Sequence, residues 1–411
     1  MSGAIYGGDD VGALVVEVGS FLTKAGYAGE ELPSVVIPSF VGVNTSEEKR
    51  KYYVGTNKLY VPRPSMEVVN PVHNGEIVDF EACEELLDDL FKNQLRCNLK
   101  EHPLMMGDEV WSSRHQREKI TELFFEKYEV PAFYLMRKPV LSAFSFGRSA
   151  AVVLDIGYSG ASASPVFDGF VLNKGVKRSP LGGRWLFELC SQAISRKGID
   201  LIPRYKILKK EPYEDAKGKR QKFVPSNLQM TSSFDALCIM NECDDFYKTI
   251  CQVSDAPLKE SGLQHIPTLA YEFCTGTKAF FGAERFAIPE SLFSPPPAAT
   301  GSESNTDLFS LIANSVESCD VDVRAILLSN IIVTGGVSLT SGLVDRLNRQ
   351  LLRNSSDGKL KVLAVQTNSE RQFSSWIGGS ILASLGAFQQ KWISKVEYSD
   401  LGKDLVEKRC L

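Results

Sequence analysis

The sequence predicts an α/β fold built from two similar halves, with a nucleotide-binding cleft between them. One hairpin pattern occurs twice, at 14–30 (LVVEVGSFLTKAGYAGE) and at 152–169 (VVLDIGYSGASASPVFDG). Each copy is an apolar strand, an acidic residue, a glycine turn with small residues and a second strand. A glycine turn exposes backbone N–H groups, and such a nest binds phosphate. Because the copies lie about half a chain apart, they predict a duplicated fold that clamps a nucleotide.

Length and composition are typical of a globular protein with more than one domain. A chain of 411 residues is too long for a single core. Hydrophobic content of 43% and a net charge of −4 give no general reason to expect affinity for nucleic acid or a membrane. The nine cysteines contain no C-x-x-C pair, which disfavours a zinc site and is typical of reduced thiols. No apolar stretch is long enough to span a bilayer, and the N-terminal MSGAIYGGDD shows no secretory signal.

The first half alternates strands and helices. Residues 11–43 are expected to be strands, with an apolar run at 13–18. Segments 84–95 and 116–128 have apolar residues at helical spacing. The apolar run 130–135, which contains Pro131, is expected to be a buried strand. This alternation predicts an α/β fold.

The second half opens near Ala150 with the second hairpin. Its segment 203–222 is polar and rich in lysine, and we expect a solvated surface insertion there. A nuclear import signal or a loop that faces DNA is the alternative. Residues 294–305 (SPPPAATGSESN) are expected to form a loop.

A third glycine element follows at 330–343. A buried strand runs into Gly335 and Gly336, and a helix with Leu343, Leu347 and Leu351 comes next. This arrangement lets a flat ring or a phosphate approach the backbone and the helix N-terminus. A tight strand-to-helix turn needs glycine for steric reasons anyway, so the element points to a nucleotide only together with the two hairpins.

The C-terminal segment 370–398 (ERQFSSWIGGSILASLGAFQQKWISKVEY) resembles the signature near the end of actin. The resemblance extends in collinear order through segments 24–30, 101–106, 117–135 and 281–290 and the Gly335–Gly336 element. Segments 6–20, 251–255, 318–324 and 374–390 resemble the nuclear actin-related proteins of the fourth class, the type found in BAF complexes. The resemblance implies two lobes, each an RNase-H-like sheet with helices. Residues 1–148 with 375–411 would form the first lobe, and 149–374, with the insertion near 203–222, the second.

The resemblance also implies which residues would meet a nucleotide, here ATP. The metal that accompanies ATP, magnesium or calcium, is left open, and no residue is assigned as a metal ligand. The implied nucleotide-binding residues are Gly19, Ser20, Lys24, Asp155, Gly157, Gly335 and Gly336.

Several positions depart from the actin pattern. Glu17 replaces an aspartate that positions the water shell of the metal, and Phe21 replaces a small residue and would crowd a phosphate. In the second hairpin, Tyr158 replaces an acidic residue and Ser162 replaces a histidine that orders the attacking water. Lys138 replaces the glutamine that activates this water. At the base site, Gln372 replaces a lysine, and Gly183 replaces an arginine, although Arg184 is adjacent.

These departures favour a protein that binds ATP without hydrolysing it and has no catalytic residues. Hydrolysis needs a divalent ion between the phosphates and a group that orients the water. The alternative is an empty cleft that packing holds closed. The four histidines, His73, His102, His115 and His265, form no recognisable triad pattern.

The resemblance implies partners as well as a cleft. In remodelling complexes, family members bind the helicase/SANT-associated helix that precedes the motor, together with one actin monomer. The apolar positions that match this groove are Phe144, Phe170, Leu382 and Leu385. Ile381, Leu385, Phe388 and Trp392 fall at helical spacing, so the two leucines could instead belong to the core.

The predicted function is therefore a nuclear scaffold subunit of SWI/SNF-type remodelling complexes, with histone acetyltransferase complexes as a further assembly. Contact with other subunits of these complexes is expected, and contact with a nucleosome is left open. The segment that would join actin filaments is reduced to 45–53 and is charged, which disfavours polymerisation. The competing hypotheses are an ATP-hydrolysing, filament-forming protein and a sugar kinase or heat-shock ATPase on the same clamp.

Overall fold

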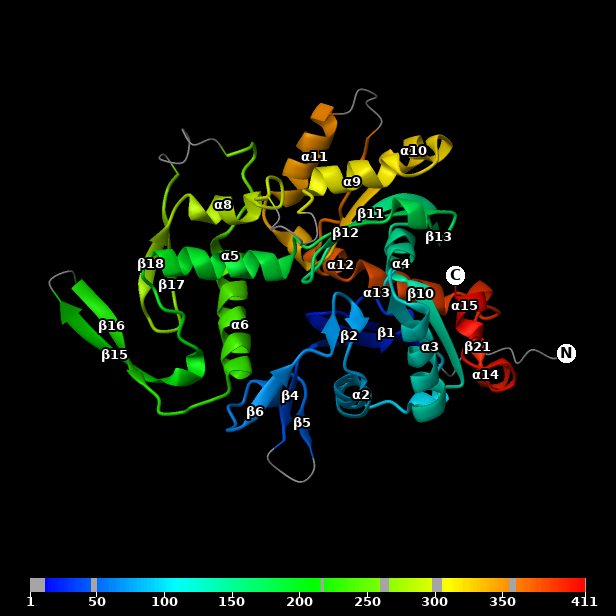
Figure 1. Ribbon diagram of the computed structural model, residues 1–411, viewed down its shortest axis with the longest axis horizontal. Helices are drawn as coiled ribbons and strands as arrows, with labels where there is room; N and C mark the ends of the chain where they lie inside the picture. The colour runs from blue at the N-terminus through cyan, green and yellow to red at the C-terminus, as the bar shows by residue number, and fades with distance from the viewer. Residues whose placement is uncertain are drawn as a thin grey trace.

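The computed structural model describes residues 12–45, 50–215, 218–258, 266–297, 305–354 and 360–410. Its two principal sheets each carry helices, and the chain forms two lobes that face each other across a cleft (Figure 1). The predicted fold class, an actin-like α/β fold with a duplicated sheet, is confirmed.

The first sheet has the strand order β21-β10-β9-β1-β2-β3. The first predicted hairpin forms its centre, since β1 (Leu14–Val18) pairs antiparallel with β2 (Leu22–Tyr27). Strand β9 (Leu104–Asp108) lies parallel to β1, and β10 (Ala132–Arg137) lies parallel to β9. The edges are β3 (Val35–Pro38) and β21 (Ile393–Ser394).

The second sheet repeats this arrangement. Strand β11 (Ala150–Ile156) pairs antiparallel with β12 (Ala161–Phe167), while β19 (Ile331–Thr334) lies parallel to β11. The order β12-β11-β19 thus matches β2-β1-β9. The remaining strands are β13 (Phe170–Val171), β14 (Lys177–Ser179) and β20 (Val362–Leu363).

The C-terminal segment packs into the core of the first sheet. Trp376, Phe388, Trp392 and Leu405 are buried there. Helix α13 (Ser374–Ser384) crosses α4 (Lys138–Ser145) so closely that a Cβ on Gly378 would lie 1.8 Å from the Leu141 carbonyl oxygen. Glycine is therefore required at this crossing.

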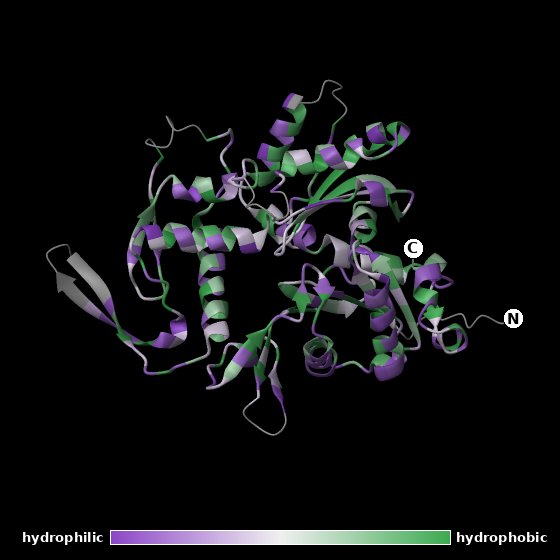
Figure 2. Ribbon diagram, in the orientation of Figure 1, coloured by the Kyte–Doolittle hydropathy of each residue, from purple (hydrophilic) through white to green (hydrophobic). Residues whose placement is uncertain are grey.

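The helices predicted in the first half are present. Helix α2 (Phe80–Asp88) continues as a π-helix, η1 (Asp89–Leu95), and α3 (Arg114–Glu122) continues as η3 (Leu123–Lys127). Figure 2 shows α2 and α3 as largely hydrophilic ribbons and the strands of the second sheet as hydrophobic ones. Leu86 on α2 and Phe124 on η3 are fully buried apolar residues.

Smaller elements extend from both lobes toward each other. A three-stranded sheet contains β4 (Val41–Asn44), β5 (Lys51–Tyr53) and β6 (Met66–Val69). The second lobe sends α6 (Ser232–Ile250) down to β6 (Figure 1). Helix α5 (Gly183–Arg196) packs beside α6.

One sequence expectation gains detail and another needs correction. The lysine-rich segment 203–222, expected as a surface insertion, includes most of a projecting hairpin formed by β15 (Ile207–Asp215) and β16 (Gly218–Pro225) (Figure 1). The helical spacing through 381–392 is not one helix: α13 ends at Ser384, and the extended backbone of Leu385 precedes Gly386. Phe388 and Trp392 are buried, while Ile381 and Leu385 are exposed.

No described helix is long and apolar enough to cross a membrane. Within the predicted loop 294–305, residues 298–304 lie outside the described part of the chain. The remaining elements are α1 (Thr56–Leu59), β7 (Val72–His73), β8 (Glu76–Ile77), η2 (Leu99–Glu101), η4 (Asn173–Gly175), η5 (Arg204–Lys206), β17 (Leu269–Glu272), β18 (Lys278–Phe281), α8 (Glu284–Glu290), α9 (Leu308–Glu317), α10 (Val321–Leu328), η6 (Gly336–Leu339), α11 (Leu343–Asn354), α12 (Asn368–Gln372), η7 (Gly386–Phe388), α14 (Lys395–Leu401) and α15 (Leu405–Arg409).

Candidate nucleotide cleft

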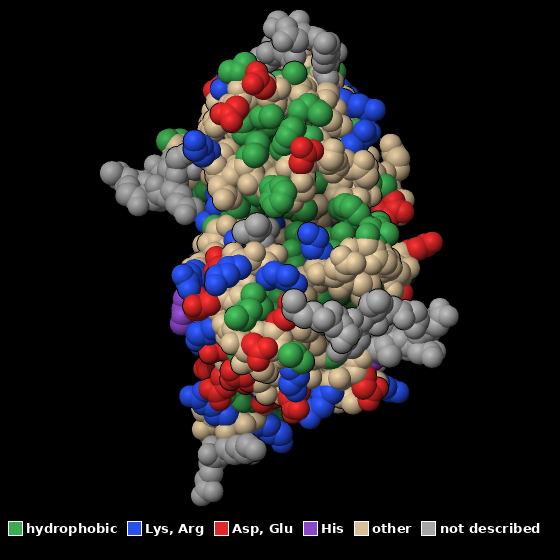
Figure 3. All heavy atoms as spheres, turned by 90° about the vertical axis from the view of Figure 1, so that its right-hand side faces the viewer, with side chains coloured by type: hydrophobic (Ala, Val, Ile, Leu, Met, Phe, Trp, Pro, Cys, Tyr) green, Lys and Arg blue, Asp and Glu red, His purple; other side chains and the backbone are tan. Residues whose placement is uncertain are grey.

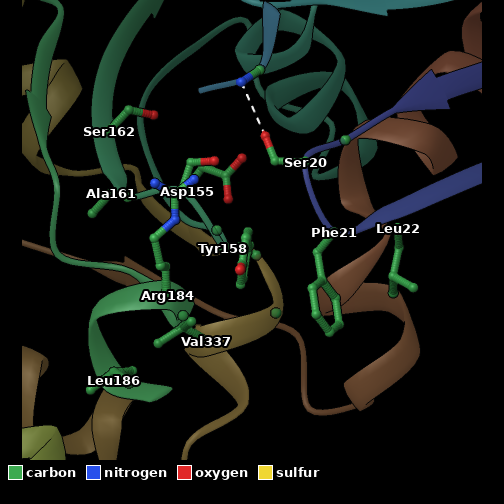
Figure 4. Close-up of a pocket in the computed structure, with 18 of the residues that line it drawn as sticks. Ser20, Phe21, Leu22, Asp155, Tyr158, Ala161, Ser162, Arg184, Leu186 and Val337 are labelled. Atoms are coloured by element: carbon green, nitrogen blue, oxygen red, sulfur yellow. Dashed lines mark hydrogen bonds between the residues drawn. The ribbon is translucent and has the colours of Figure 1, made fainter. Parts of the chain in front are cut away.

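The turns of both hairpins and the turn after β19 line one cavity of about 750 Å³ between the lobes (Figure 4). The duplicated strand order brings them together, because corresponding strand ends of the two sheets face each other. All seven residues that the resemblance implied for a nucleotide lie on this cavity: Gly19, Ser20, Lys24, Asp155, Gly157, Gly335 and Gly336.

Two of the glycines are sterically required. The N–H of Gly19 donates to the Leu22 carbonyl oxygen at 3.1 Å, and a Cβ on Gly19 would lie 2.9 Å from that oxygen. Gly335 has φ +90°, and a Cβ there would lie 2.3 Å from Oδ1 of Asp155. These glycines therefore explain the tight turns without any ligand, as the sequence alone had allowed.

The acidic residue of the first hairpin forms an internal ion pair. Glu17 and Lys24 face each other in the β1–β2 register, and their side chains meet at 2.9 Å. The hydroxyl of Ser375 donates to the other carboxylate oxygen of Glu17 at 2.5 Å. Burial alone would raise the pKa of Glu17, but Lys24, Lys138 and these hydrogen bonds lower it to about 2. Lys24, the implied phosphate ligand, is thus already neutralised within the protein.

A second lysine is neutralised in the same way. Nζ of Lys138 lies 2.6 Å from a carboxylate oxygen of Glu109, which follows β9. Both side chains are largely buried. Burial would lower the pKa of Lys138, but Glu109 and Glu17 raise it well above its ordinary value. Lys138 is therefore a fixed cation with a partner, which cannot accept a proton from water.

Asp155 has the opposite environment. Burial and the negative charges of Glu109 and Glu17 raise its pKa to about 6, against the opposing effects of Lys138 and Lys24. The residue across the hairpin from it is Ser162, which supplies no charge. Asp155 therefore brings an incompletely compensated negative charge to the cavity.

An aromatic pair lies between the two hairpin turns. The rings of Phe21 and Tyr158 have centroids 5.0 Å apart (Figure 4). Phe187 and Phe40 pack against both rings. Ser20, next to Phe21, accepts a hydrogen bond from the N–H of Gly75 at 3.1 Å (Figure 4). Phe21 and Tyr158 therefore occupy space between the two turns, on the wall of the cavity.

The two ends of the cavity differ in how well they fit a nucleotide. The cavity volume and the Gly335–Gly336 turn leave room for a base and ribose. The phosphate end does not fit a metal triphosphate, because the two lysines are paired, Ser20 is bonded to Gly75 and Tyr158 offers no carboxylate. Among the described residues, no group of three or more His, Cys, Asp or Glu could hold a metal ion.

Sequence reasoning missed several residues of the cavity. Glu109 could have been found, because it follows a parallel strand at the edge where ligands of such sheets gather. Trp111, whose ring lies 4.0 Å from the Arg178 guanidinium, has no sequence signal. His73, which the sequence treats as an ordinary histidine, also lines the cavity. At the base end, Tyr247 and Lys248 come from the last turns of α6.

The four predicted groove residues lie on another face of the molecule. Phe170 on β13 is 55% exposed, and Leu385 after α13 is 41% exposed. Phe144 on α4 is half-buried, and Leu382 is half-buried against the first core. Helix α4 contacts both α13 and β13, which places these elements side by side. Figure 3 faces this side and shows exposed hydrophobic side chains in its upper half.

Comparison with known proteins agrees with this architecture. A family model described as actin matches residues 8–411. Actin-related protein 4 of Arabidopsis thaliana is 36% identical, over 99% of this chain and 100% of its own length. The protein of that name in Yarrowia lipolytica is 37% identical, over 98% of this chain and 97% of its own length. A Schizosaccharomyces pombe protein named SWI/SNF and RSC complexes subunit arp42 is 35% identical, over 98% of this chain and 100% of its own length. The chain therefore belongs to the actin family, within the group of actin-related proteins that are similar to actin-related protein 4.

Proposed function

We propose that this protein is a non-enzymatic, actin-related subunit of nuclear chromatin-remodelling complexes of the SWI/SNF type, with histone acetyltransferase complexes as a further assembly. The observation that carries the proposal is its similarity, over the whole chain, to actin-related protein 4 and to a relative named as a subunit of SWI/SNF and RSC complexes. Its place in the nucleus follows from the same similarity. Co-purification of the tagged full chain from nuclei, followed by mass spectrometry, tests it: remodeller subunits are expected, and their absence would overturn it.

The side chains of the cavity support a protein that does not hydrolyse ATP. Hydrolysis needs a metal bridging the phosphates and a group that orients water. At the positions that would do this, the chain has Tyr158, Ser162 and the ion-paired Lys138. Phosphate release from added ATP and magnesium should not exceed that of buffer, and steady release would support the filament-forming alternative.

Binding of ATP without hydrolysis is a separate part of the proposal, supported by the cavity volume and by the glycine turns that line the cavity. Ligand released by acid from the purified protein and separated by ion exchange tests it directly. A nucleotide in equal amount to the protein would restore the predicted ATP clamp. Sedimentation of the purified protein tests the filament-forming alternative separately. Of the segment 45–53 that would join filaments, residues 46–49 lie outside the described part of the chain. Arg50 of this segment forms an ion pair with Glu81 at 2.7 Å.

The surface formed by β13, α4 and the end of α13 is the proposed binding site for the helicase/SANT-associated helix, shared with an actin monomer. An amphipathic helix needs an exposed apolar strip, and Phe170, Ile381 and Leu385 supply one. We expect the projecting β15–β16 hairpin, where Lys209 and Lys222 are exposed, to make any contact with a nucleosome.

A matched pair of variants tests the helix site. Phe170→Asp places a charge in the proposed strip, and Phe280→Asp changes a phenylalanine of similar exposure on β18, in another part of the second lobe (Figure 1). Binding of the recombinant helix that precedes the SWI/SNF motor should weaken about tenfold or more for Phe170→Asp. Equal binding by both variants would place the helix elsewhere.

A further inference from the structure

The two lobes are bridged by their own side chains at the place where the resemblance implies a triphosphate. Phe21 belongs to the turn of the first hairpin and Tyr158 to the turn of the second, and their rings are 5.0 Å apart. Phe40 of the first lobe lies edge-on to both. The hydroxyl of Tyr158 donates to the sulfur of Met240 on α6 at 3.1 Å. Aromatic pairs of this kind stabilise an interface beyond the area that they bury.

A second set of contacts closes the outer end of the cleft. The hydroxyl of Thr231, at the start of α6, donates to the Met66 carbonyl oxygen at 2.6 Å. The N–H of Val68 on β6 donates to the Ser233 hydroxyl at 2.9 Å. Ser233 in turn donates to Glu67.

An apolar cluster lies behind these polar contacts. It joins Phe40 and Leu59 of the first lobe to Leu237 on α6, and all three are buried. The small sheet of the first lobe and the long helix of the second are thus joined directly, by hydrogen bonds and by packing.

The two lysines of the cleft are paired with carboxylates of the protein itself. Lys24 pairs with Glu17 and Lys138 pairs with Glu109, so neither lysine presents an unpaired charge to a phosphate. Asp155, which lines the same cavity, would repel one. A polyphosphate would therefore have to break two buried ion pairs or bring its own cation.

We infer that contacts between the lobes, centred on the Phe21–Tyr158 pair and on the β6–α6 hydrogen bonds, replace nucleotide and metal as the clamp of this protein. The cleft is then closed in the ligand-free state, and closure does not respond to ATP. This inference concerns the chain alone and holds whether or not the protein joins a remodelling complex.

Hydrogen exchange on the purified full chain tests the inference. Peptides that cover 66–69 and 231–240 report on closure, because they contain the Val68–Ser233 hydrogen bond. After removal of bound ligand by charcoal and EDTA, their protection should be unchanged, and added ATP with magnesium should not increase it. Loss of protection on stripping, with recovery on addition of ATP and magnesium, would overturn the inference.

Variants identify the contacts responsible. Phe21→Gly with Tyr158→Asp removes both rings, and we expect exchange of 66–69 and 231–240 to become at least about tenfold faster. Exchange of the first-sheet core, 104–106, should stay unchanged, which separates opening of the cleft from unfolding. If the double variant fails to fold, Phe21→Leu keeps an apolar side chain and should give a smaller acceleration in the same peptides. Phe280→Gly is the control, and equal exchange in the control and the aromatic variants would overturn the role of the pair.

Discussion

Glu17 and Asp155 occupy equivalent positions in the two hairpins, each in the first strand before the glycine turn, yet their chemistry differs. The pKa of Glu17 is lowered to about 2 and that of Asp155 is raised to about 6. Loss of solvent raises the pKa of both carboxylates, so desolvation alone does not distinguish them. Glu17 has a lysine opposite it in the hairpin and a serine from the C-terminal segment, whereas Asp155 has Ser162 opposite it. A repeated backbone motif therefore does not carry a repeated charge state.

The two carboxylates give opposite dependences of stability on pH. Because the pKa of Glu17 is lowered on folding, its contribution is present above about pH 4.5 and is lost as pH falls toward 2. Because the pKa of Asp155 is raised, its contribution is present below about pH 4 and is lost as pH rises through 6. At neutral pH the ionised Glu17 thus stabilises the folded state, whereas the ionised Asp155 destabilises it.

The largest effect should come from removing the cation of the first hairpin. Lys24→Met leaves Glu17 buried without its closest partner, and we expect the free energy of unfolding at neutral pH to fall by about 3–5 kcal/mol. Urea denaturation followed by circular dichroism measures it. Adding Glu17→Gln should recover most of the loss. Lys127→Met, which breaks an exposed pair with Glu84, is the matched control, and a loss as large as that of Lys24→Met would contradict the argument.

Asp155 of the second hairpin packs against Gly335, which lies in the turn after β19. A methyl group on Gly335 would collide with Asp155, and its backbone, with φ +90° and ψ 159°, is strained for any other residue. Gly335→Ala should therefore lower stability by about 3 kcal/mol. Gly336→Ala is the control, since the nearest atom to its Cβ would be 3.9 Å away. Similar melting temperatures for the two variants would show that the turn can relax.

Asp155→Asn tests the cost of the second carboxylate. The amide keeps the shape and removes the charge, so the variant should be more stable than the natural protein by about 2–3 kcal/mol above pH 7. The difference should shrink to less than about 1 kcal/mol at pH 4, where Asp155 is protonated in the folded chain and about half protonated in the unfolded chain. Denaturation midpoints at pH 4, 6 and 8 measure this, with the exposed Asp200→Asn as control. A difference that does not vary with pH would refute the raised pKa.

Much of this fold could be predicted from local pattern. The two hairpins, the strand before Gly335 and the helices after 80 and 114 follow from apolar spacing and glycine position, which act within a few residues. A bulky side chain at Phe21, in a turn of otherwise small residues, could also be recognised from the sequence. The end of α13 was harder to predict, because the helical spacing of apolar residues continues past Gly386 although the helix itself ends at Ser384.

The charge balance of the cleft could not be predicted in the same way. Glu109 reaches Lys138 from another strand, and Ser375 reaches Glu17 across 358 positions of sequence. The resemblance implies that Lys24 contacts a phosphate, and the hairpin register also places it opposite Glu17, with which it forms an ion pair. Glu109 and Ser375 are thus distant in sequence from the residues that they contact, and no local pattern encodes such contacts.

The smallest expected effect isolates the contribution of one such distant partner. Ser375→Ala removes a hydrogen bond to Glu17 but leaves the ion pair with Lys24, so we expect a loss of about 1–2 kcal/mol at neutral pH. Because this bond helps to lower the pKa of Glu17, the loss should diminish as pH falls toward 2. Ser384→Ala, at the exposed end of the same helix, is the control. A loss that persists at low pH would mean that Ser375 stabilises the crossing of α13 rather than the charge of Glu17, and the contrast between the two hairpins would then rest on Lys24 alone.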